Sequence, residues 1–215
     1  MITGKSREPF LGVLLTYPQT GSPAARVEVV AARRAPVSGG VGLGVLGAGN
    51  YASAVFLPNV VKAGQVQRIG IASGTGLSAR HAAQRYGFAY ASSDEREVLG
   101  DERVQIAAVL TRHNHHARQV FEALRAGKHV FCEKPLALTD AELDEISAAL
   151  AQPGTPLLMV GFNRRFAPFA VQLKTFLQGA GEPLSAHYRV NAGYLPPNHW
   201  LHDPAQGGGR IIGEA

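Results

Sequence analysis

The sequence has too few cysteines for a disulfide-bonded protein or a cysteine-rich zinc site. Cys132 is the only cysteine, so no disulfide can form within the chain. A lone thiol suits a reducing compartment, and we expect a cytoplasmic protein. Long apolar runs are also missing, since the run over residues 10–17 is far shorter than the roughly 20 residues that cross a bilayer. No small-residue cleavage pattern follows the first charged residues, so we expect neither a signal peptide nor a membrane partner.

Charged residues are scarce and dispersed. They make up 17% of the chain, and the net charge of +5 gives a pI near 9.6. Basic residues occur singly or in pairs, as at Arg33-Arg34, without the aromatic-interleaved patch of a nucleic-acid surface. We therefore expect no nucleic-acid partner, and the positive charge favours an anionic small ligand. With 46% hydrophobic residues, the composition is that of a globular protein.

Between residues 41 and 161, short apolar runs alternate with longer amphipathic ones, a pattern typical of βα units around a parallel sheet. The expected strands cover 42–46, 66–72, 105–111, 128–132 and 156–161. The expected helices cover 50–63, 77–86, 115–126 and 139–151, the last opened by a capping box of Thr139 and Glu142. We predict an α/β fold, a Rossmann doubly wound parallel sheet followed by the start of a truncated α+β domain.

The two flanks of this unit have a different pattern. Residues 1–40 contain two expected strands, 11–17 and 26–31, and a linker, so we interpret them as the tail of a preceding domain. Residues 41–162 form the predicted dinucleotide-binding domain. From residue 163 we expect a helix to about 177 and then an antiparallel strand over 186–192, which begins a second domain for substrate binding and oligomerisation.

Glycine is abundant, at 25 of 215 residues, and two glycine motifs overlap. Gly42-x-Gly44-x-x-Gly47 would have to be strand and turn at once, so we reject it. Gly47-x-Gly49-x-x-Ala52 follows a strand and opens a helix, as a phosphate-binding turn requires. An ordinary glycine turn without a ligand is the alternative, and the strand before and helix after make it less favourable.

The end of the second expected strand has no carboxylate, although NAD-binding folds usually place an acid there for the ribose hydroxyls. The segment contains Ser73, Thr75 and, one turn later, Arg80. Small hydroxyls beside an arginine suit a 2′-phosphate, which favours NADP over NAD. The alternative is that Ser73 and Thr75 only form the turn.

Two further motifs follow the next parallel strands and must meet the glycine turn at the same sheet edge. The first, Thr111 to His116, has three histidines but no carboxylate nearby as a third ligand, so we expect no metal. The second, Glu133-Lys134-Pro135, places an ammonium at the crevice along this sheet edge. There it can act as an acid or base, or stabilise charge. A solvated lysine in a proline turn is the alternative.

Taken in order, these motifs resemble the glucose–fructose oxidoreductase/inositol dehydrogenase (Gfo/Idh/MocA) family. The resemblance covers residues 41–215 and is most specific in the run A-G-K-H-V-x-x-E-K-P-L at 126–136. It implies reversible hydride transfer between a nicotinamide and a carbinol carbon of a sugar, cyclitol or related polyol. It also implies that the full-length protein is a homo-oligomer.

The resemblance implies roles for individual residues. Lys134 would act in catalysis, contacting the substrate hydroxyl and the nicotinamide ribose, with a cis peptide at Pro135. His116 would lie beside the cofactor, although Arg112 stands where the family usually has proline. We expect NADP or NAD to be bound by Gly47, Gly49, Asn50, Tyr51, Ala52, Ser73, Thr111, His116, Glu133, Lys134 and Pro135, and the sugar-like substrate by Arg165, His199 and Trp200.

The chain departs from the family pattern near its end. Gly213 stands where the family has a catalytic Asp, and the sequence stops two residues before the place of the family's catalytic His. The alternative function is therefore a catalytically inactive dinucleotide-binding module. The first 40 residues weakly resemble the tail of a zinc-type medium-chain dehydrogenase domain, so we expect a fragment of a longer fused protein.

Overall fold

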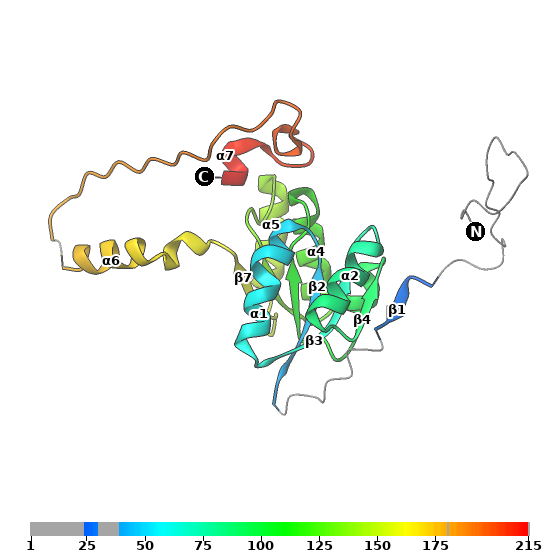
Figure 1. The fold of residues 1–215 in the computed structure, drawn as a ribbon. Helices are drawn as coiled ribbons and strands as arrows, with labels where there is room; N and C mark the ends of the chain where they lie inside the picture. The colour runs from blue at the N-terminus through cyan, green and yellow to red at the C-terminus, as the bar shows by residue number, and fades with distance from the viewer. Residues whose placement is uncertain (1–23, 30–38, 180, 215) are drawn as a thin grey trace, which may run out of the picture.

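The computed structural model describes residues 24–29, 39–179 and 181–214, which contain one seven-stranded sheet (Figure 1). The strand order is β1-β4-β3-β2-β5-β6-β7. Six strands run parallel, and β1 alone pairs antiparallel, with β4. The strands are β1 (Arg26–Glu28), β2 (Val41–Leu46), β3 (Val66–Ala72), β4 (Tyr90–Ser92), β5 (Ile106–Val109), β6 (His129–Cys132) and β7 (Leu158–Val160). The predicted α/β class with a doubly wound sheet is confirmed.

Helices cover both faces of the sheet. The helices of the described residues are η2 (Ala52–Phe56), α1 (Leu57–Ala63), α2 (Leu77–Tyr86), α3 (Glu95–Leu99), α4 (His113–Arg125), α5 (Asp140–Leu150), η3 (Asn163–Phe166), α6 (Pro168–Leu177), η4 (Trp200–His202) and α7 (Gly209–Glu214). Helix α6 extends away from the sheet (Figure 1). Side chains of α1 and α2 pack in one core with Val45 and Ile71, whereas α3, α4 and α5 pack in a second core with Leu46 and Val109. The two cores use alternate residues of the same strands, because successive strand side chains point to opposite faces.

The glycines rejected as a phosphate turn lie inside β2. A Cβ on Gly42 would lie 1.8 Å from the Arg103 carbonyl oxygen, and one on Gly44 would lie 2.5 Å from a Val98 methyl carbon. Close packing therefore explains both glycines, and they lie within the strand, as the rejection of the first motif expected. The capping box of Thr139 and Glu142 at the start of α5 is also present.

Three structural details differ from the sequence-based expectation. The strand expected over 26–31 is β1, which spans only Arg26–Glu28 and extends the edge of the Rossmann sheet beside β4. Both β4 and α3 were missed, since each is shorter than the window in which periodicity can be detected. The expected strand over 186–192 was wrong: these residues are exposed and form no strand, because no described strand lies beside them to pair with their backbone.

Some expectations lie outside the described residues. These are the strand over 11–17, most of the linker before residue 41, and the segments that resemble a medium-chain dehydrogenase. Within the described part of the chain, no helix is both long enough and apolar enough to span a membrane.

Candidate functional site

The turn that leaves β2 has the geometry of a phosphate-binding turn. Gly47 has a φ of 101°, and its N–H donates to the Ala72 carbonyl at 2.8 Å. A Cβ on Gly47 would lie 2.6 Å from the Leu110 carbonyl oxygen, so only glycine fits between the β3 and β5 ends. Ala52 is fully buried one turn later, where the helix packs against the sheet.

The surroundings of Gly49 differ from those of Gly47. Its φ lies outside the left-handed region, and a Cβ there would meet no atom within 4 Å. Neither backbone conformation nor packing within the described chain therefore requires glycine at this position. The open space beside the Gly49 backbone would let a ligand such as a pyrophosphate approach it at the start of the helix.

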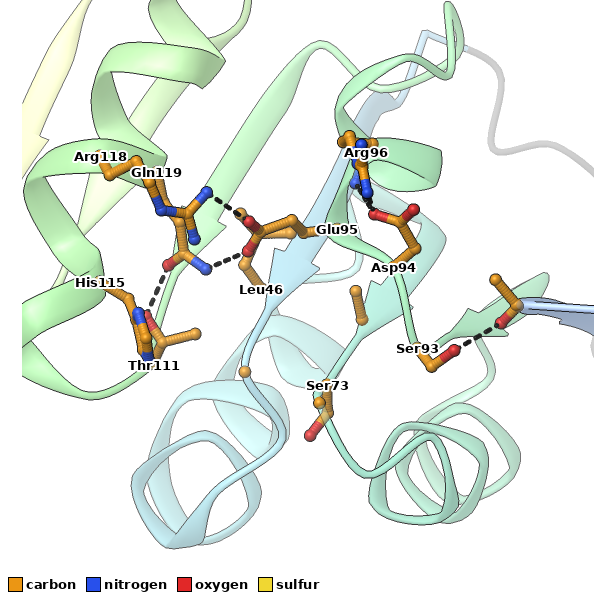
Figure 2. A pocket seen from close by; sticks show the side chains of 14 residues that line it. Leu46, Ser73, Ser93, Asp94, Glu95, Arg96, Thr111, His115, Arg118 and Gln119 are labelled. Carbon is orange, nitrogen blue, oxygen red and sulfur yellow. Dashed lines mark hydrogen bonds and ion pairs between the residues drawn. The ribbon is translucent and has the colours of Figure 1, made fainter.

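A pocket of about 520 Å³ opens beside this turn, at the carboxyl edge of β2, β3 and β5 (Figure 2). It lies at the point where the strand order reverses, which is the usual ligand site of doubly wound sheets. Its lining combines strand ends with the α3 and α4 N-termini and consists of Ala25, Leu46, Gly47, Ala72, Ser73, Gly74, Ser93, Asp94, Glu95, Arg96, Thr111, His115, Arg118 and Gln119. The open turn at Gly49, the pocket and its polar lining together fit a dinucleotide.

One wall of the pocket is a polar network. Thr111 Oγ1 donates to Gln119 Oε1 at 2.6 Å, and Gln119 Nε2 donates to the Glu95 carboxylate. Arg118 forms an ion pair with the other oxygen of Glu95 at 2.5 Å. Figure 2 shows Glu95 pointing toward Arg118 and Gln119. The carboxylate is therefore neutralised by protein groups.

The turn after β6 contains Lys134, and the buried His116 side chain contacts the backbone of this turn. The Lys134–Pro135 peptide is cis, as the resemblance implied. His116 is 1% exposed, and its ring nitrogens face two carbonyl oxygens, that of Pro135 at 2.7 Å from Nδ1 and that of Thr111 at 3.1 Å from Nε2. We place the proton of the neutral ring on Nδ1, which makes the shorter contact. His116 thus connects the Thr111 loop to the lysine turn.

His116 makes stability depend on pH. Burial lowers its pKa below the ordinary 6.5, against the opposing effect of the carbonyls of Pro135 and Thr111 and of the Glu133 carboxylate. The unfolded chain therefore binds a proton first, so the free energy of unfolding falls as the pH drops from 6.5 toward the lowered pKa. We expect the slope from this group to be at most about 1.4 kcal/mol per pH unit.

Urea denaturation from about pH 5 to pH 8 measures this slope. His116→Gln keeps an amide donor for the Pro135 carbonyl and should flatten the dependence. His81→Gln, at an exposed histidine of α2, is the matched control and should leave the slope as it is. An unchanged slope in His116→Gln would show that other groups cause the pH dependence.

Tyr51 connects the glycine turn to the lysine turn. Burial and the neighbouring Glu133 carboxylate, to which its hydroxyl donates, raise the pKa of Tyr51 to about 12. The phenol therefore stays protonated at neutral pH and acts as a donor. Glu133 also accepts from the Lys134 N–H at 3.3 Å, and a Cβ on Gly161 would lie 2.7 Å from its second oxygen. The ends of β2, β6 and β7 thus meet at one carboxylate.

The segment around η4 and α7 lies over the same edge. Lys134 Nζ donates to the Gly213 carbonyl, and His113 Nδ1 contacts the Gly207 carbonyl at 2.9 Å. The His113 ring also packs edge-on against Trp200, with centroids 4.9 Å apart. Arg112, the residue in place of the family's proline, donates to Gln206 at 2.6 Å. The segment thereby covers the lysine turn.

The structure brings many of the predicted site residues to one edge and leaves others apart. Gly47, Ser73 and Thr111 line the pocket. His199 and Trp200 lie on the covering segment, where the His199 ring accepts from the Leu201 N–H. Arg165 is exposed on η3. Among the described residues, no three His, Cys, Asp or Glu side chains are grouped as metal ligands.

Several residues of the site were missed by sequence reasoning. They are Glu95, Arg118 and Gln119, which form the polar wall of the pocket, and His113, which contacts the covering segment at the Gly207 carbonyl. No motif contains the first three, because they come from α3, which was not predicted, and from the middle of α4. His113 was noticed only as a possible metal ligand.

Known proteins are similar to this chain in sequence and fold. Residues 41–162 match the GFO_IDH_MocA family, described as an oxidoreductase family with an NAD-binding Rossmann fold. Inositol 2-dehydrogenase of Salmonella typhimurium (strain LT2) is 35% identical over 107 residues, which are 48% of this chain and 32% of that protein. Inositol 2-dehydrogenase 2 of Saccharopolyspora erythraea is 34% identical over 161 residues, 74% of this chain and 46% of that protein.

Solved structures agree with the sequence relatives. A levoglucosan dehydrogenase in complex with NADH superposes with a TM-score of 0.71 at 26% identity, over 82% of this chain and 51% of that one. The chain thus spans at most about half the length of these three relatives.

Proposed function

This chain belongs to the Gfo/Idh/MocA oxidoreductase family and carries its NAD-binding Rossmann fold, and from this we propose that it transfers a hydride between a nicotinamide dinucleotide and a carbinol carbon of a sugar, a cyclitol or a related polyol. The observation that carries the proposal is the position of Lys134. Its turn follows β6 at the same sheet edge as the glycine turn after β2 and the pocket beside it. The sugar and inositol dehydrogenases among the relatives support this substrate class.

In this proposal, each group has a defined task. When bound, the nicotinamide dinucleotide supplies the two-electron acceptor or donor. Gly47 and Gly49 allow the pyrophosphate to approach the backbone, with Asn50, Tyr51 and Ala52 opening the helix behind it. Lys134 Nζ, now on the Gly213 carbonyl, would bind the substrate hydroxyl, accept its proton as a neutral amine during oxidation and return it as an ammonium during reduction. His116 and Glu133 hold the turn that positions this ammonium.

The proposal also covers substrate contacts, further domains and oligomerisation. Arg165, His199 and Trp200 are proposed to contact the polyol. Residues 163–215 are proposed to begin a substrate and oligomerisation domain, and the full-length protein to be a homo-oligomer. A medium-chain dehydrogenase domain before residue 41 also stays a proposal, which the sequence upstream in the gene would test.

A second candidate function is a dinucleotide-binding module without catalysis. The observation that favours it is the environment of Gly213, which stands in place of the family's Asp. A Cβ there would lie 2.8 Å from Leu201 Cδ1 and 3.1 Å from His113 Cε1, so this arrangement has no room for a carboxylate. The carbonyl of Gly213 is the group that Lys134 contacts instead.

The full-length natural protein tests the two functions together. We expect it to bind NADPH or NADH, measured by nicotinamide fluorescence, and to reduce the oxidised dinucleotide when a polyol such as inositol is added, measured by absorbance. Binding without turnover across a panel of sugars and cyclitols would favour the second function. Failure to bind either dinucleotide would contradict both.

A further inference from the structure

The first described strand, β1, lies outside the family match. That match covers residues 41–162, whereas β1 covers Arg26–Glu28. Strand β1 nevertheless belongs to the same sheet, where it pairs antiparallel with β4 as the outermost strand of the described residues (Figure 1). A segment that precedes the family's domain therefore extends the sheet of that domain.

Main-chain and side-chain contacts hold β1 on β4. The Val29 N–H donates to the Ala89 carbonyl at 2.9 Å, and Val29 is 8% exposed in the core that contains α1 and α2 side chains. On the other face of the sheet, the Arg26 guanidinium carbon lies 3.6 Å from the centroid of the buried Tyr90 ring. Arg26 Nη1 also lies 3.7 Å from the Asp101 carboxylate, whose side chain is 7% exposed. A cation over an aromatic face is attracted to it, so Arg26 stabilises the paired position of β1.

The residue just before β1 reaches the pocket beside the glycine turn. Ala25 lines this pocket together with Ser93 and Asp94, which follow β4. The Ala25 carbonyl accepts the Ser93 N–H at 2.9 Å, and Ser93 Oγ lies 3.5 Å from the same oxygen (Figure 2). Asp94 then caps α3 by accepting the Arg96 N–H. The contact with Ala25 thus holds the segment that connects β4 to α3 and lines the pocket.

We propose that β1 is part of the dinucleotide site, where its pairing with β4 closes the pocket at the adenosine end and holds the Ser93–Asp94 segment in place. The inference rests on the proposed function, since it concerns the same dinucleotide. Lys134 follows β6 on one side of the glycine turn, whereas β3, β4 and β1 lie on the other. The two nucleotides of a dinucleotide bind on opposite halves of such a sheet, so the adenosine half lies toward β1. By linkage, pairing of β1 and binding of the dinucleotide strengthen each other by the same factor.

Proline substitutions in the full-length natural protein test this pairing. Because hydrogen-bonded pairs alternate along an antiparallel ladder, the Val27 N–H faces Ala91 of β4, whereas the Glu28 N–H faces the open edge. Val27→Pro removes the inward donor and should raise the dissociation constant by about fivefold or more for whichever of NADPH and NADH binds more tightly. Glu28→Pro keeps the ladder and should weaken binding far less. Nicotinamide fluorescence measures both variants without any need for turnover.

A side-chain variant weakens the pairing without a change in the backbone. Arg26→Ala removes the contacts with Tyr90 and Asp101, and we expect the dissociation constant to rise by about threefold or more. Arg85→Ala is the matched control, because it removes an exposed cation near the Tyr86 ring of α2. It should leave the dissociation constant as it was.

Hydrogen exchange measures the coupling in the unaltered protein. Saturation with the preferred dinucleotide should slow exchange of the amides of residues 25–29 by about fivefold or more. If Val27→Pro does not fold, Arg26→Ala and the exchange result decide. Unchanged exchange in β1, or folded Val27→Pro and Arg26→Ala variants that bind as the unaltered protein does, would show that β1 only extends the sheet and would overturn this inference alone. Absence of binding for both dinucleotides in the unaltered protein would overturn the proposed function and the inference with it.

Discussion

Gly47→Ala should destabilise the fold, whereas Gly49→Ala should fold normally and lose the dinucleotide. At position 47 a methyl group would lie 2.6 Å from a backbone oxygen of Leu110, on a residue with a φ of 101°. Backbone atoms of two strand ends cannot move aside as a flexible side chain can. We expect the free energy of unfolding to fall by about 2–5 kcal/mol, combining the strained φ with the clash.

At position 49 the expected change is in binding. A methyl group there meets no protein atom, so the free energy of unfolding should change by less than about 1 kcal/mol. The same methyl group occupies the space through which a pyrophosphate reaches the backbone, and we expect the dissociation constant for the preferred dinucleotide to rise by about tenfold or more.

Urea denaturation and nicotinamide fluorescence on both variants measure these effects. Gly127→Ala is a suitable control, because Gly127 has a φ of 72° and no atom within 4 Å of a built Cβ. It isolates the cost of a left-handed alanine, about 1–2 kcal/mol, from that of the clash. Unimpaired dinucleotide binding by Gly49→Ala would show that the pyrophosphate does not approach this turn.

The central strands and their helices could be predicted because each covers enough residues to show a period. The predicted ranges 66–72 and 77–86 coincide with β3 and α2. Strand β4 has three residues and α3 has five, so neither provides one full repeat of its pattern. These short elements lie along one side of the pocket, and its lining therefore includes Arg96, which no motif marks.

Local alternation was misleading where tertiary pairing decides the outcome. Residues 186–192 alternate like a strand, yet a strand forms only when a neighbour accepts and donates its backbone hydrogen bonds. The reverse holds for Arg26–Glu28, which sequence assigned to a preceding domain tail and which pairs with β4 at the sheet edge. Strand β4 lies far from β1 in the sequence, so no local pattern identifies it as the partner.

The candidate site was predictable where motifs of polar or glycine residues directly follow parallel strands. The carboxyl ends of parallel strands share one edge, which places the turns after β2 and β6 together without knowledge of side-chain contacts. Sequence does not show what each residue touches there. His116 was expected beside the cofactor, and the structure buries it under Pro135 and Thr111 as a link between two loops. Its role beside a cofactor stays a prediction.

Lys134→Ala should lower kcat for polyol oxidation by about 10²–10⁴ while leaving dinucleotide affinity nearly unchanged. The range is that of a lost general acid or base. Affinity should persist because the glycine turn and the pocket beside it do not include the lysine. Lys62→Ala, at an exposed lysine of α1, removes the same charge outside the site and should keep kcat. Steady-state kinetics with the preferred dinucleotide measure both variants.

A second substitution separates the proton of Lys134 from its charge. Lys134→Arg keeps a cation at the turn, but a guanidinium stays protonated at every working pH and cannot exchange a proton with the substrate hydroxyl. We expect its rate to fall nearly as far as that of the alanine variant. Trp200, the only tryptophan, reports independently on the covering segment that Lys134 contacts through Gly213. If the arginine variant retains the rate with unchanged Trp200 fluorescence, the lysine acts through its charge alone, and the proton must leave by another group.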